Sequence, residues 1–593
     1  MDGKGQTLFW FHNEKVKVEV PFFQRPYVWD EEDWEELLVS INNANKESMP
    51  FIGSFILQEL EDKYYVIDGQ QRITTLTVMI KAYVDTFKEL PDGVKSQFLN
   101  FIYDIKYHGL QPVYNPRLIP SNIDKQDFDA VMLGDAEKIE EQKGKITEAY
   151  KYFVKYLQGN SYEKNIEMGE RILTNNKFFI TIILDVNDDE QKIFDSVNSL
   201  GKDLTNADII KNYLYQRMKD EVANDPVMVN KILEHHQQYW VKCFYSDEKR
   251  AFWEAKKSYG RIQMNNLEAF LKDFAIIKGI YSAYVVGGIE GLAKAYKIHI
   301  NKLDYQELQQ FSKELSEYAN CYYTYNSAYE KMDDFRISDL INTTLLIMDK
   351  LETSTFNPYI LKVIKNSEDD MEEKLFALQK FVLIRFIYKA KTKNYNKVCD
   401  TLMSVDNPVQ YLESYNDSEE LGLNEFPVGL KRIYNKPAIL ILFLLELIRR
   451  IGEESKYPGG MKYVLSLEHI MPKAWEKNWS KVPSFRWQET TGEYEQVTEY
   501  SELIENRKNM ITSIGNMTLL TSGLNSAIGN AAFPEKIMGN GKYDGYKKYV
   551  GSLTIAQEII EVYEQTKQWD ERNIIARNQS IFNELNQHYK FTK

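Results

Sequence analysis

The chain has 593 residues, which is more than one hydrophobic core accommodates, so its length predicts about three or four domains. Hydrophobic residues make up 43% and charged residues 27%, and 40 Tyr and 30 Phe argue for filled cores and against disorder. The formal net charge of −14 argues against a protein that coats nucleic acid non-specifically, although a nuclease needs basic residues only along one channel.

Cysteine usage and hydropathy indicate a reducing, aqueous environment. Cys243, Cys321 and Cys399 lie far apart and form no CxxC pair, so neither a disulfide framework nor a cysteine-built zinc site is expected. The N-terminal "MDGKGQTLFW" has no apolar signal-peptide core. The most apolar run, 438–448, is too short to span a bilayer and predicts a buried helix. We therefore expect a cytoplasmic protein with no membrane partner.

The first 215 residues mix strand and helix patterns. "KVKVEV" alternates and stops at Pro21, "FIGSFILQEL" and "KYYVIDG" predict a strand pair joined by a polar turn, and "KFFITIILDV" predicts another strand. "ITTLTVMIKAYVDTF", from Ile73, predicts a helix, and so does "QKIFDSVNSL", which Gly201 ends. Thr205 and Asp208 predict a capping box that starts a further helix, "NADIIKNYLYQRM".

A polar loop, "DGQQR" (68–72), lies between one of these strands and the helix that follows it. Backbone amides at a helix N-terminus attract anions, an arginine there can grip phosphate, and Gly69 permits a tight turn. No G-x-x-x-x-G-K-[ST] occurs, which excludes a P-loop. The loop predicts an anion site, and a plain surface turn is the alternative.

Residues 216–435 are rich in Leu, Tyr, Lys and Glu, poor in Gly, and show no clear repeat period. They predict a helical connecting domain, with a soft boundary between about 425 and 460 because the apolar helix could pack with either side. The run "RFIYKAKTKNYNK" (385–397) could follow a DNA backbone, and a solvated helix face is the alternative.

The C-terminal part contains "SLEHIMP" and, after a predicted long loop, "SIGNMTLLTSGLNSAIGN". This order places Glu468 and His469 at a strand end, Asn516 before an apolar strand, and Asn525 before a helix. A histidine at such a position can take a proton from water that attacks a phosphate, while a carboxylate and an amide hold one Mg²⁺. The middle asparagine would brace the loop and orient the histidine. The alternative is a structural histidine with asparagines that serve turns.

Basic residues around this motif give the acidic chain local positive charge, and a solvated face is again the alternative. They are Lys473, Lys477, Lys481, Arg486, Arg507 and Lys508.

Residues 455–560 resemble the HNH nuclease family, in the form fused to the C-terminus of GmrSD-type restriction proteins. "LEHIMP", "IGNMTLL", Asn525 and Lys536 carry the resemblance. It implies that His469 is the general base, that Glu468 and Asn525 are metal-site residues, and that Asn516 is the bracing residue, with Mg²⁺ or Mn²⁺ as the metal. The third position is asparagine rather than histidine, which is common in the wider family.

Three N-terminal motifs together, "PFFQRPYVW" (21–29), "DGQQR" and "IFDSVNSLGKDLTNADIIKN" (193–212), resemble the ParB-like N-terminal domain of the same proteins. The resemblance implies binding and hydrolysis of GTP or ATP and a role in sensing modified DNA. The implied nucleotide-site residues are Asp68, Gly69, Gln70, Gln71, Arg72, Asn198, Asp208 and Lys211. The implied pocket or sensing residues are Gln24, Arg25, Tyr27 and Trp29. Core packing for Tyr27 and Trp29, and the capping box for Asp208, are the alternatives.

The expected fold class is multidomain α+β, predominantly helical, with a ParB-like α/β sensor at 1–215, a helical domain at 216–435 and a ββα-metal (HNH) domain at 436–593. The expected function is a type IV-like, modification-dependent endonuclease of anti-phage defence, regulated by nucleotide turnover. Its expected partners are double-stranded, modified phage DNA and a nucleoside triphosphate, and a homodimer stays open. The alternatives are a phosphorothioate-sensing nickase of similar layout and a nucleotide-gated DNA-binding module with an inactive HNH fold.

Overall fold

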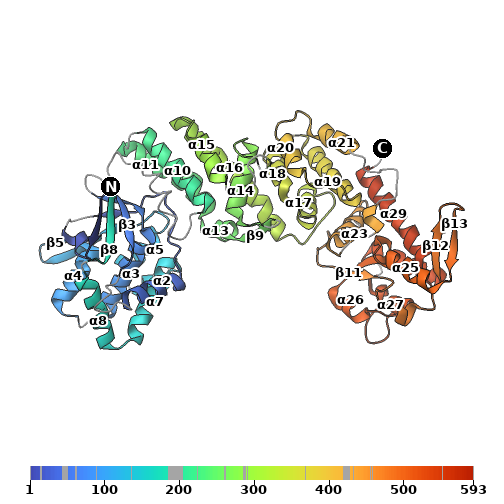
Figure 1. The fold of residues 1–593 in the computed structure, drawn as a ribbon, viewed down its shortest axis with the longest axis horizontal. Helices are drawn as coiled ribbons and strands as arrows, with labels where there is room; N and C mark the ends of the chain where they lie inside the picture. Colours follow the sequence, from blue (N-terminus) through green and yellow to red (C-terminus); the bar gives the residue numbers. More distant parts are fainter. Residues whose placement is uncertain are drawn as a thin grey trace. The chain divides into compact units, whose positions relative to one another are not determined.

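The structure is a computed structural model, in which two compact units can be described, Met1–Glu248 with Ala293–Lys313, and Lys249–Leu292 with Glu314–Lys593 (Figure 1). Residues 2–591 are described except 14–16, 43–50, 60–62, 88–89, 135, 176, 185–204, 223–224, 260–261, 283, 285–288, 290, 367–368, 419–427, 432, 434, 454–455, 457–458 and 550–551. The predicted helix at 191–200, with Asn198, and the predicted break at Gly201 lie outside the described residues. The predicted class, multidomain α+β with mostly helices, is confirmed.

A six-stranded sheet forms the centre of the first unit, in the order β1-β8-β3-β4-β2-β7. Its strands are β1 (Asp2–Gln6), β2 (Val18–Glu19), β3 (Ser54–Glu59), β4 (Tyr64–Asp68), β7 (Leu118–Ile119) and β8 (Phe179–Leu184). The strand pair predicted from "FIGSFILQEL" and "KYYVIDG" is confirmed, since β3 and β4 pair antiparallel. The strand predicted from "KFFITIILDV" is confirmed as β8, which pairs parallel with β3.

Helix α3 (Gln70–Thr86) follows β4 directly and is buried along most of its length. It begins three residues before the predicted start at Ile73. Gly69 precedes it with φ of 96°, and a Cβ there would lie 2.6 Å from the Phe55 ring, so both the turn and the packing require glycine. The chain therefore enters α3 close against β3.

Helices and one hairpin make up the rest of this unit, and in Figure 1 α2, α3, α5 and α7 gather beside the sheet. They are α1 (Trp10–Asn13), α2 (Glu31–Asn42), α4 (Asp92–Ile102), the hairpin β5 (Tyr103–His108) and β6 (Gln111–Pro116), α5 (Lys125–Leu133), α6 (Ala136–Glu141), α7 (Lys145–Gly159), α8 (Tyr162–Thr174), α10 (Asn206–Glu221), α11 (Pro226–His236), a π-helical turn (Gln237–Val241), α12 (Lys242–Phe244) and α15 (Leu292–Ile300). The predicted cap of α10 is confirmed, because the Thr205 side chain accepts from the Asp208 amide.

Helices dominate the middle of the chain, as predicted. They are α13 (Asp247–Glu254), α14 (Asn266–Ile277), α16 (Tyr305–Glu330), α17 (Leu340–Lys350), a 3₁₀ turn (Ser354–Phe356), α18 (Asn357–Asn366), α19 (Met371–Ile387), α20 (Tyr395–Leu402), α21 (Pro408–Ser418), α22 (Val428–Lys431) and α23 (Asn435–Arg449). The hairpin of β9 (Lys256–Tyr259) and β10 (Ile262–Asn265) was not predicted, because "KKSY" is too polar and too short to show strand alternation.

Helix α23 confirms the buried helix predicted at 438–448. Its glutamate, Glu446, is fully buried and accepts hydrogen bonds from the Thr554 hydroxyl (2.7 Å) and the Ile555 amide (3.0 Å). These contacts cap the N-terminus of α28 (Thr554–Thr566), and Arg450 pairs with the same carboxylate at 2.9 Å. None of the described helices combines the length and the apolar character that crossing a bilayer requires.

The C-terminal region brings β11 (Ser466–His469) and β14 (Met517–Leu520) together as an antiparallel pair, with α26 (Ser522–Ile528) after β14. The predicted long loop between His469 and Asn516 is wrong. That stretch forms α24 (Glu476–Trp479), the hairpin of β12 (Ser484–Gln488) and β13 (Glu493–Val497), and α25 (Tyr500–Ile511). Asn525, predicted to precede a helix, lies inside α26. Helices α27 (Phe533–Met538) and α29 (Glu571–Tyr589) complete the region.

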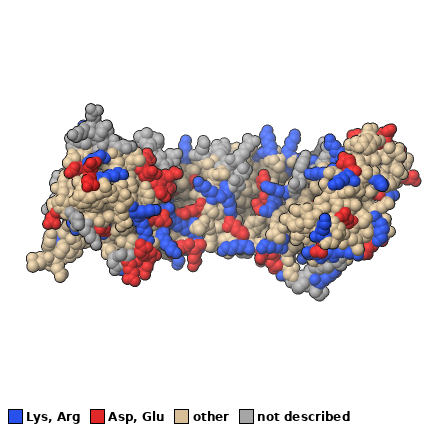
Figure 2. All heavy atoms as spheres, turned by 90° about the horizontal axis from the view of Figure 1, so that it is seen from below, with Lys and Arg blue, Asp and Glu red and all other residues tan. Residues whose placement is uncertain are grey.

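Arg507, predicted to supply local positive charge, is fully buried instead. It pairs with the buried carboxylate of Glu571 at 3.3 Å and donates to the Trp479 carbonyl oxygen at 2.9 Å. Arginine can occupy this position because its planar donors are all satisfied by fixed acceptors. On the face drawn in Figure 2, the remaining Lys and Arg side chains are interspersed with Asp and Glu side chains. On this face, therefore, positive charge that could bind DNA is local and not continuous.

Candidate functional site

A pocket of about 580 Å³ opens at the end of β11. It is lined by Ser466 to His469, by Pro472 and Lys473 in the following turn, by Asn525, Gly529 and Asn530 at α26, and by Ile439 and Leu465. The structure thus brings Glu468, His469 and Asn525, which are up to 57 residues apart in the sequence, to one cavity.

His469 is the last residue of β11 and is half-buried. Burial, followed by the charges of Lys473 and Lys536, lowers the pKa of His469 to about 4. The imidazole is therefore neutral at neutral pH and able to accept a proton. Within the described part of the chain, no hydrogen bond engages either of its ring nitrogens.

Asn516 lies fully buried beneath the pocket, directly before β14. Its Oδ1 accepts from the Met471 amide at 2.8 Å, and its Nδ2 donates to the Met471 carbonyl oxygen at 2.9 Å. Its own carbonyl oxygen accepts from the Ile470 amide at 2.8 Å. Asn516 therefore clamps the backbone that follows His469 and acts on the histidine through that backbone, without touching the imidazole.

The Glu468 carboxylate is occupied by partners that sequence reasoning did not identify. The fully buried Lys536 ammonium pairs with Glu468 Oε1 and donates to the His469 carbonyl oxygen at 2.8 Å. The Tyr546 hydroxyl donates to the same Oε1 at 3.3 Å. Burial raises the pKa of Glu468 and lowers that of Lys536, and the charge of each partner opposes the shift of the other. Lys536 was part of the sequence motif, but only the fold assigns it this contact.

Two oxygen atoms at the pocket remain for a divalent cation. The Asn525 Nδ2 donates to the Ser466 hydroxyl (3.0 Å) and to the Leu467 carbonyl oxygen (2.9 Å), and no described residue donates to its Oδ1. No described side chain donates to Glu468 Oε2 either, and the His469 amide also hydrogen-bonds to this carboxylate. Among the described residues no group of three or more His, Cys, Asp or Glu could hold a metal. Two oxygen ligands suit Mg²⁺, which keeps several waters, and do not suit a closed transition-metal site.

The second group of predicted residues meets at the end of β4. Gln71 donates to the Pro26 carbonyl oxygen at 3.1 Å and accepts from the Val28 amide at 2.9 Å, while Gln70 donates to the Arg25 carbonyl oxygen at 3.1 Å. Gln24 in turn donates to the Val66 carbonyl oxygen. The loop 68–72 and the segment 24–28 therefore form one hydrogen-bonded unit.

Tyr27 is buried in the core next to this unit. Its hydroxyl hydrogen-bonds to Thr75 at 2.6 Å and accepts from the Trp34 indole at 2.8 Å, and burial raises its pKa. Its amide donates to the Asp124 carboxylate at 3.0 Å. Trp29 is half-buried and packs against the same core. Both aromatic residues thus stabilise the segment, and Trp29 retains an exposed edge.

Cationic side chains lie on either side of this segment. Lys211 is fully buried, lies 3.6 Å from Asp208, and has no hydrogen-bond partner in the described part of the chain. Burial lowers its pKa, Asp208 opposes the shift, and the charge of Arg25 adds to it. Arg72 is half-buried and reaches the Ser54 carbonyl oxygen at 3.4 Å. A buried ammonium beside the charge of Arg25, held by an ion pair of 3.6 Å to Asp208 and by no hydrogen bond among the described residues, favours an anionic ligand.

Asp68 and Gly69 complete this second group at the turn into α3, so all the predicted residues except Asn198 lie in the same part of the first unit. The sequence could not show that Gln70 and Gln71 bind backbone, because their partners lie about 45 residues earlier.

Two family models match the chain. Residues 7–215 match the N-terminal domain of the GmrSD restriction endonuclease, and residues 429–584 match the C-terminal domain of GmrSD restriction endonucleases. A search of curated proteins found no match. The first range contains the loop at 68–72 and the second contains the pocket at His469, so each group of predicted residues lies within a matched domain.

Proposed function

The chain belongs to the GmrSD restriction endonuclease family and acts on DNA, and we propose that it is a modification-dependent HNH endonuclease whose cut is regulated by a nucleotide. The single observation that best supports this proposal is that the neutral His469 lines one pocket together with Glu468 and Asn525. The proposed class is a type IV-like enzyme of anti-phage defence.

In the proposed reaction, His469 accepts a proton from a water molecule. The water oxygen forms a bond to phosphorus, one phosphorus–oxygen bond to a sugar breaks, and the released sugar oxygen takes up a proton from solvent. Asn516 and Lys536 keep the backbone of residues 469–471 in place, so that the imidazole stays close to the attacking water.

Glu468 Oε2 and Asn525 Oδ1 would hold Mg²⁺ or Mn²⁺. A divalent cation at this position supplies positive charge that stabilises the phosphate as its negative charge increases. Lys473, which also lines the pocket, adds a cation on the same side. The lysine–glutamate pair orients the carboxylate, because Lys536 and Tyr546 both donate to Oε1.

The N-terminal unit is proposed to be the ParB-like sensor, which binds and hydrolyses GTP or ATP. Support comes from the buried Lys211, whose ammonium pairs with Asp208 at 3.6 Å without a hydrogen bond among the described residues, and from Arg25 and Arg72 near the N-terminus of α3. Together these groups favour phosphate. Discrimination of modified DNA is assigned to this unit because a phosphate-gripping nuclease site reads little sequence by itself.

Digestion of four DNA substrates tests the proposal: unmodified, hydroxymethylated, glucosylated and phosphorothioated DNA, each with and without GTP and ATP. We expect a base-modified DNA to be cut preferentially, and only with a nucleoside triphosphate present. Preference for phosphorothioated DNA would select the nickase alternative instead. Equal cutting of all four substrates, with nucleotide making no difference, would contradict the proposed regulation.

Arg72→Ala should abolish nucleotide hydrolysis while leaving the HNH pocket intact, because Arg72 belongs to the first unit and His469 to the second. Losing one charge-assisted phosphate contact should weaken nucleotide binding by about 1.5–3 kcal/mol. Phosphate release and equilibrium nucleotide binding measure the effect. Arg171→Ala, on α8 and away from the 68–72 loop, is the matched control. Normal nucleotide hydrolysis by Arg72→Ala would show that the 68–72 loop is only a structural turn.

A further inference from the structure

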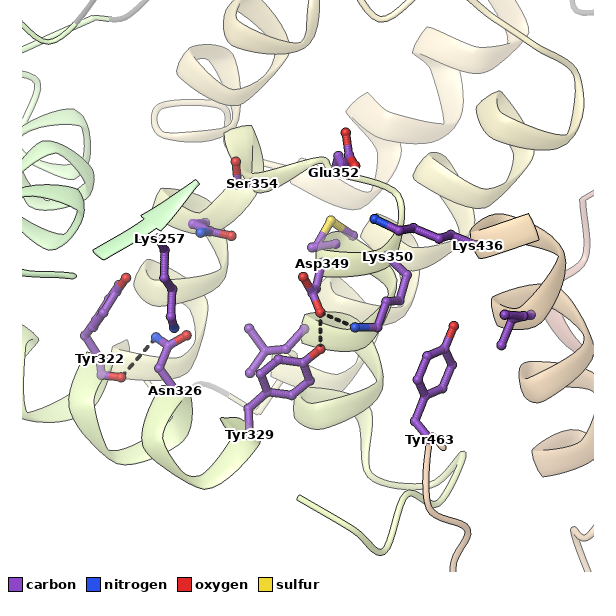
Figure 3. A pocket seen from close by; sticks show the side chains of 14 residues that line it. Lys257, Tyr322, Asn326, Tyr329, Asp349, Lys350, Glu352, Ser354, Lys436 and Tyr463 are labelled. Atoms are coloured by element: carbon purple, nitrogen blue, oxygen red, sulfur yellow. Dashed lines mark hydrogen bonds and ion pairs between the residues drawn. The ribbon is translucent and has the colours of Figure 1, made fainter. Parts of the chain in front are cut away.

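A second pocket, of about 500 Å³, lies in the second unit among β9, α16, α17 and α23 (Figure 3). We propose that it binds one nucleotide, with the base at Asn326 and Tyr329 and the phosphate near Lys436, and that this nucleotide belongs to the DNA held at the nuclease pocket. The inference deepens the proposed function and rests on it for the identity of the DNA. Ligand sites of this size are concave and carry a few directed polar groups among apolar walls.

The polar groups of this pocket fall into a satisfied set and an unsatisfied set. Asp349 accepts from the Tyr329 hydroxyl at 2.8 Å and from the Lys350 ammonium at 2.7 Å, the two dashed lines that meet at Asp349 in Figure 3. Asn326 Nδ2 donates to the Tyr322 carbonyl oxygen at 3.0 Å. In the part of the chain that the structure describes, nothing donates to Asn326 Oδ1, and the Tyr463 hydroxyl has no hydrogen-bond partner.

Both groups are half-buried, so they are open to hydrogen bonds from water or from a ligand in the cavity. Asn326 Oδ1 is an acceptor and the Tyr463 hydroxyl is both donor and acceptor, and they converge on the same cavity. A nucleobase offers donors and acceptors on one planar edge, and its faces pack on tyrosine rings. The directed polar groups therefore fit a base better than they fit an apolar ligand.

The charges of the pocket favour a nucleotide over a bare phosphate chain. Lys257, Lys350 and Lys436 line it together with Asp349 and Glu352, so the net charge is close to neutral. Lys257 is paired with Glu330, and Lys350 with Asp349. Of these three lysines, only Lys436 is exposed and makes no ion pair within the described residues. The pocket therefore provides for one phosphate and not for a long anionic track.

The pocket borders the nuclease pocket directly. Ile439 lines both cavities, and Lys436 lies three residues before it on α23, on the same helix face. Tyr463 lines this pocket, and the chain then runs through Leu465 to His469, which line the other. Six residues of chain span at most about 20 Å. At 3.4 Å per nucleotide, the bound nucleotide lies within about six positions of the scissile phosphate.

Fluorescence of 2-aminopurine, placed at each position in turn along a short duplex, tests the proposal with the full-length protein. The His469→Ala variant serves as the background, so that cleavage does not interfere. We expect a fluorescence increase at a position within about six nucleotides of the cut, because a base that leaves the stack is no longer quenched. Asn326→Leu and Lys436→Gln should each weaken the response about tenfold, the equivalent of one hydrogen bond or ion contact.

Lys331→Gln is the matched control, since Lys331 is an exposed lysine just after α16 that lines neither pocket. An equal loss in Lys331→Gln and Lys436→Gln would show a general charge effect and overturn the assignment. Because Lys436 is exposed, its variant keeps the test decisive even where Asn326→Leu fails to fold.

Titration of AMP and GMP into the same proteins distinguishes the two sources of a nucleotide. Binding that Asn326→Leu removes and Arg72→Ala retains, without any 2-aminopurine signal, assigns the pocket to a free nucleotide. If neither the 2-aminopurine signal nor mononucleotide binding changes in Asn326→Leu or Lys436→Gln, the proposed site is overturned. Both readouts are binding measurements, so they stand apart from cleavage: a His469→Ala variant that still cuts contradicts the proposed reaction and not the pocket.

Discussion

Replacing His469 with alanine should lower DNA cleavage by about 10²–10⁴-fold while DNA binding and folding stay close to those of the parent protein. The side chain is half-buried at a strand end and makes no hydrogen bond within the described residues, so its removal disturbs little else. Its lowered pKa means that the proton acceptor is present throughout the neutral range. Single-turnover cleavage of a modified duplex, with binding measured separately, gives the two quantities.

His108→Ala, an exposed histidine on β5, is the matched control and should cut at the parental rate. Asn525→Ala should lose activity through the metal, and a raised concentration of Mg²⁺ or Mn²⁺ should then restore part of it. If added metal alone restored cleavage by His469→Ala, His469 would be the metal ligand and Asn525 would not. Cleavage by His469→Ala near the parental rate would leave the HNH assignment without its base.

Lys536→Met should destabilise the C-terminal region by about 3–5 kcal/mol, because it leaves the buried Glu468 carboxylate without its cation. The same change removes the hydrogen bond to the His469 carbonyl oxygen, so cleavage should fall even at temperatures where the protein stays folded. Urea unfolding followed by tryptophan fluorescence is informative here, since Trp475, Trp479 and Trp569 are buried in the same region.

The double variant Glu468→Gln with Lys536→Met separates stability from activity. It removes both charges together, so most of the lost free energy of unfolding should return, whereas cleavage should not, because Oε2 is no longer a carboxylate oxygen. Lys548→Met is the matched control: it breaks an exposed pair with Asp544 in the same C-terminal region and should leave stability nearly unchanged. Equal unfolding of the parent and Lys536→Met would show that the buried pair adds nothing.

Local patterns in the sequence predicted the elements that carry the chemistry. The alternation of "KYYVIDG" and the apolar stripe after it predicted β4 and α3, and Thr205 predicted the start of α10, because each depends on residues within one or two turns of chain. The apolar run at 438–448 predicted a buried helix for the same reason. The spacing of His469, Asn516 and Asn525 also indicated a nuclease motif, which stays a prediction, while the two matched domains support a restriction endonuclease.

Tertiary structure decided what those residues touch. Glu468 pairs with Lys536, 68 residues later, and Gln71 holds Pro26, 45 residues earlier, and neither pairing leaves a periodic signal in the sequence. The hairpin of β12 and β13 lies where a loop was expected. Arg507 is a core residue because its acceptors are a distant backbone carbonyl oxygen and Glu571. Local backbone preference determines which element forms, whereas long-range packing determines which charges are buried and paired, and only the folded chain contains the second kind of information.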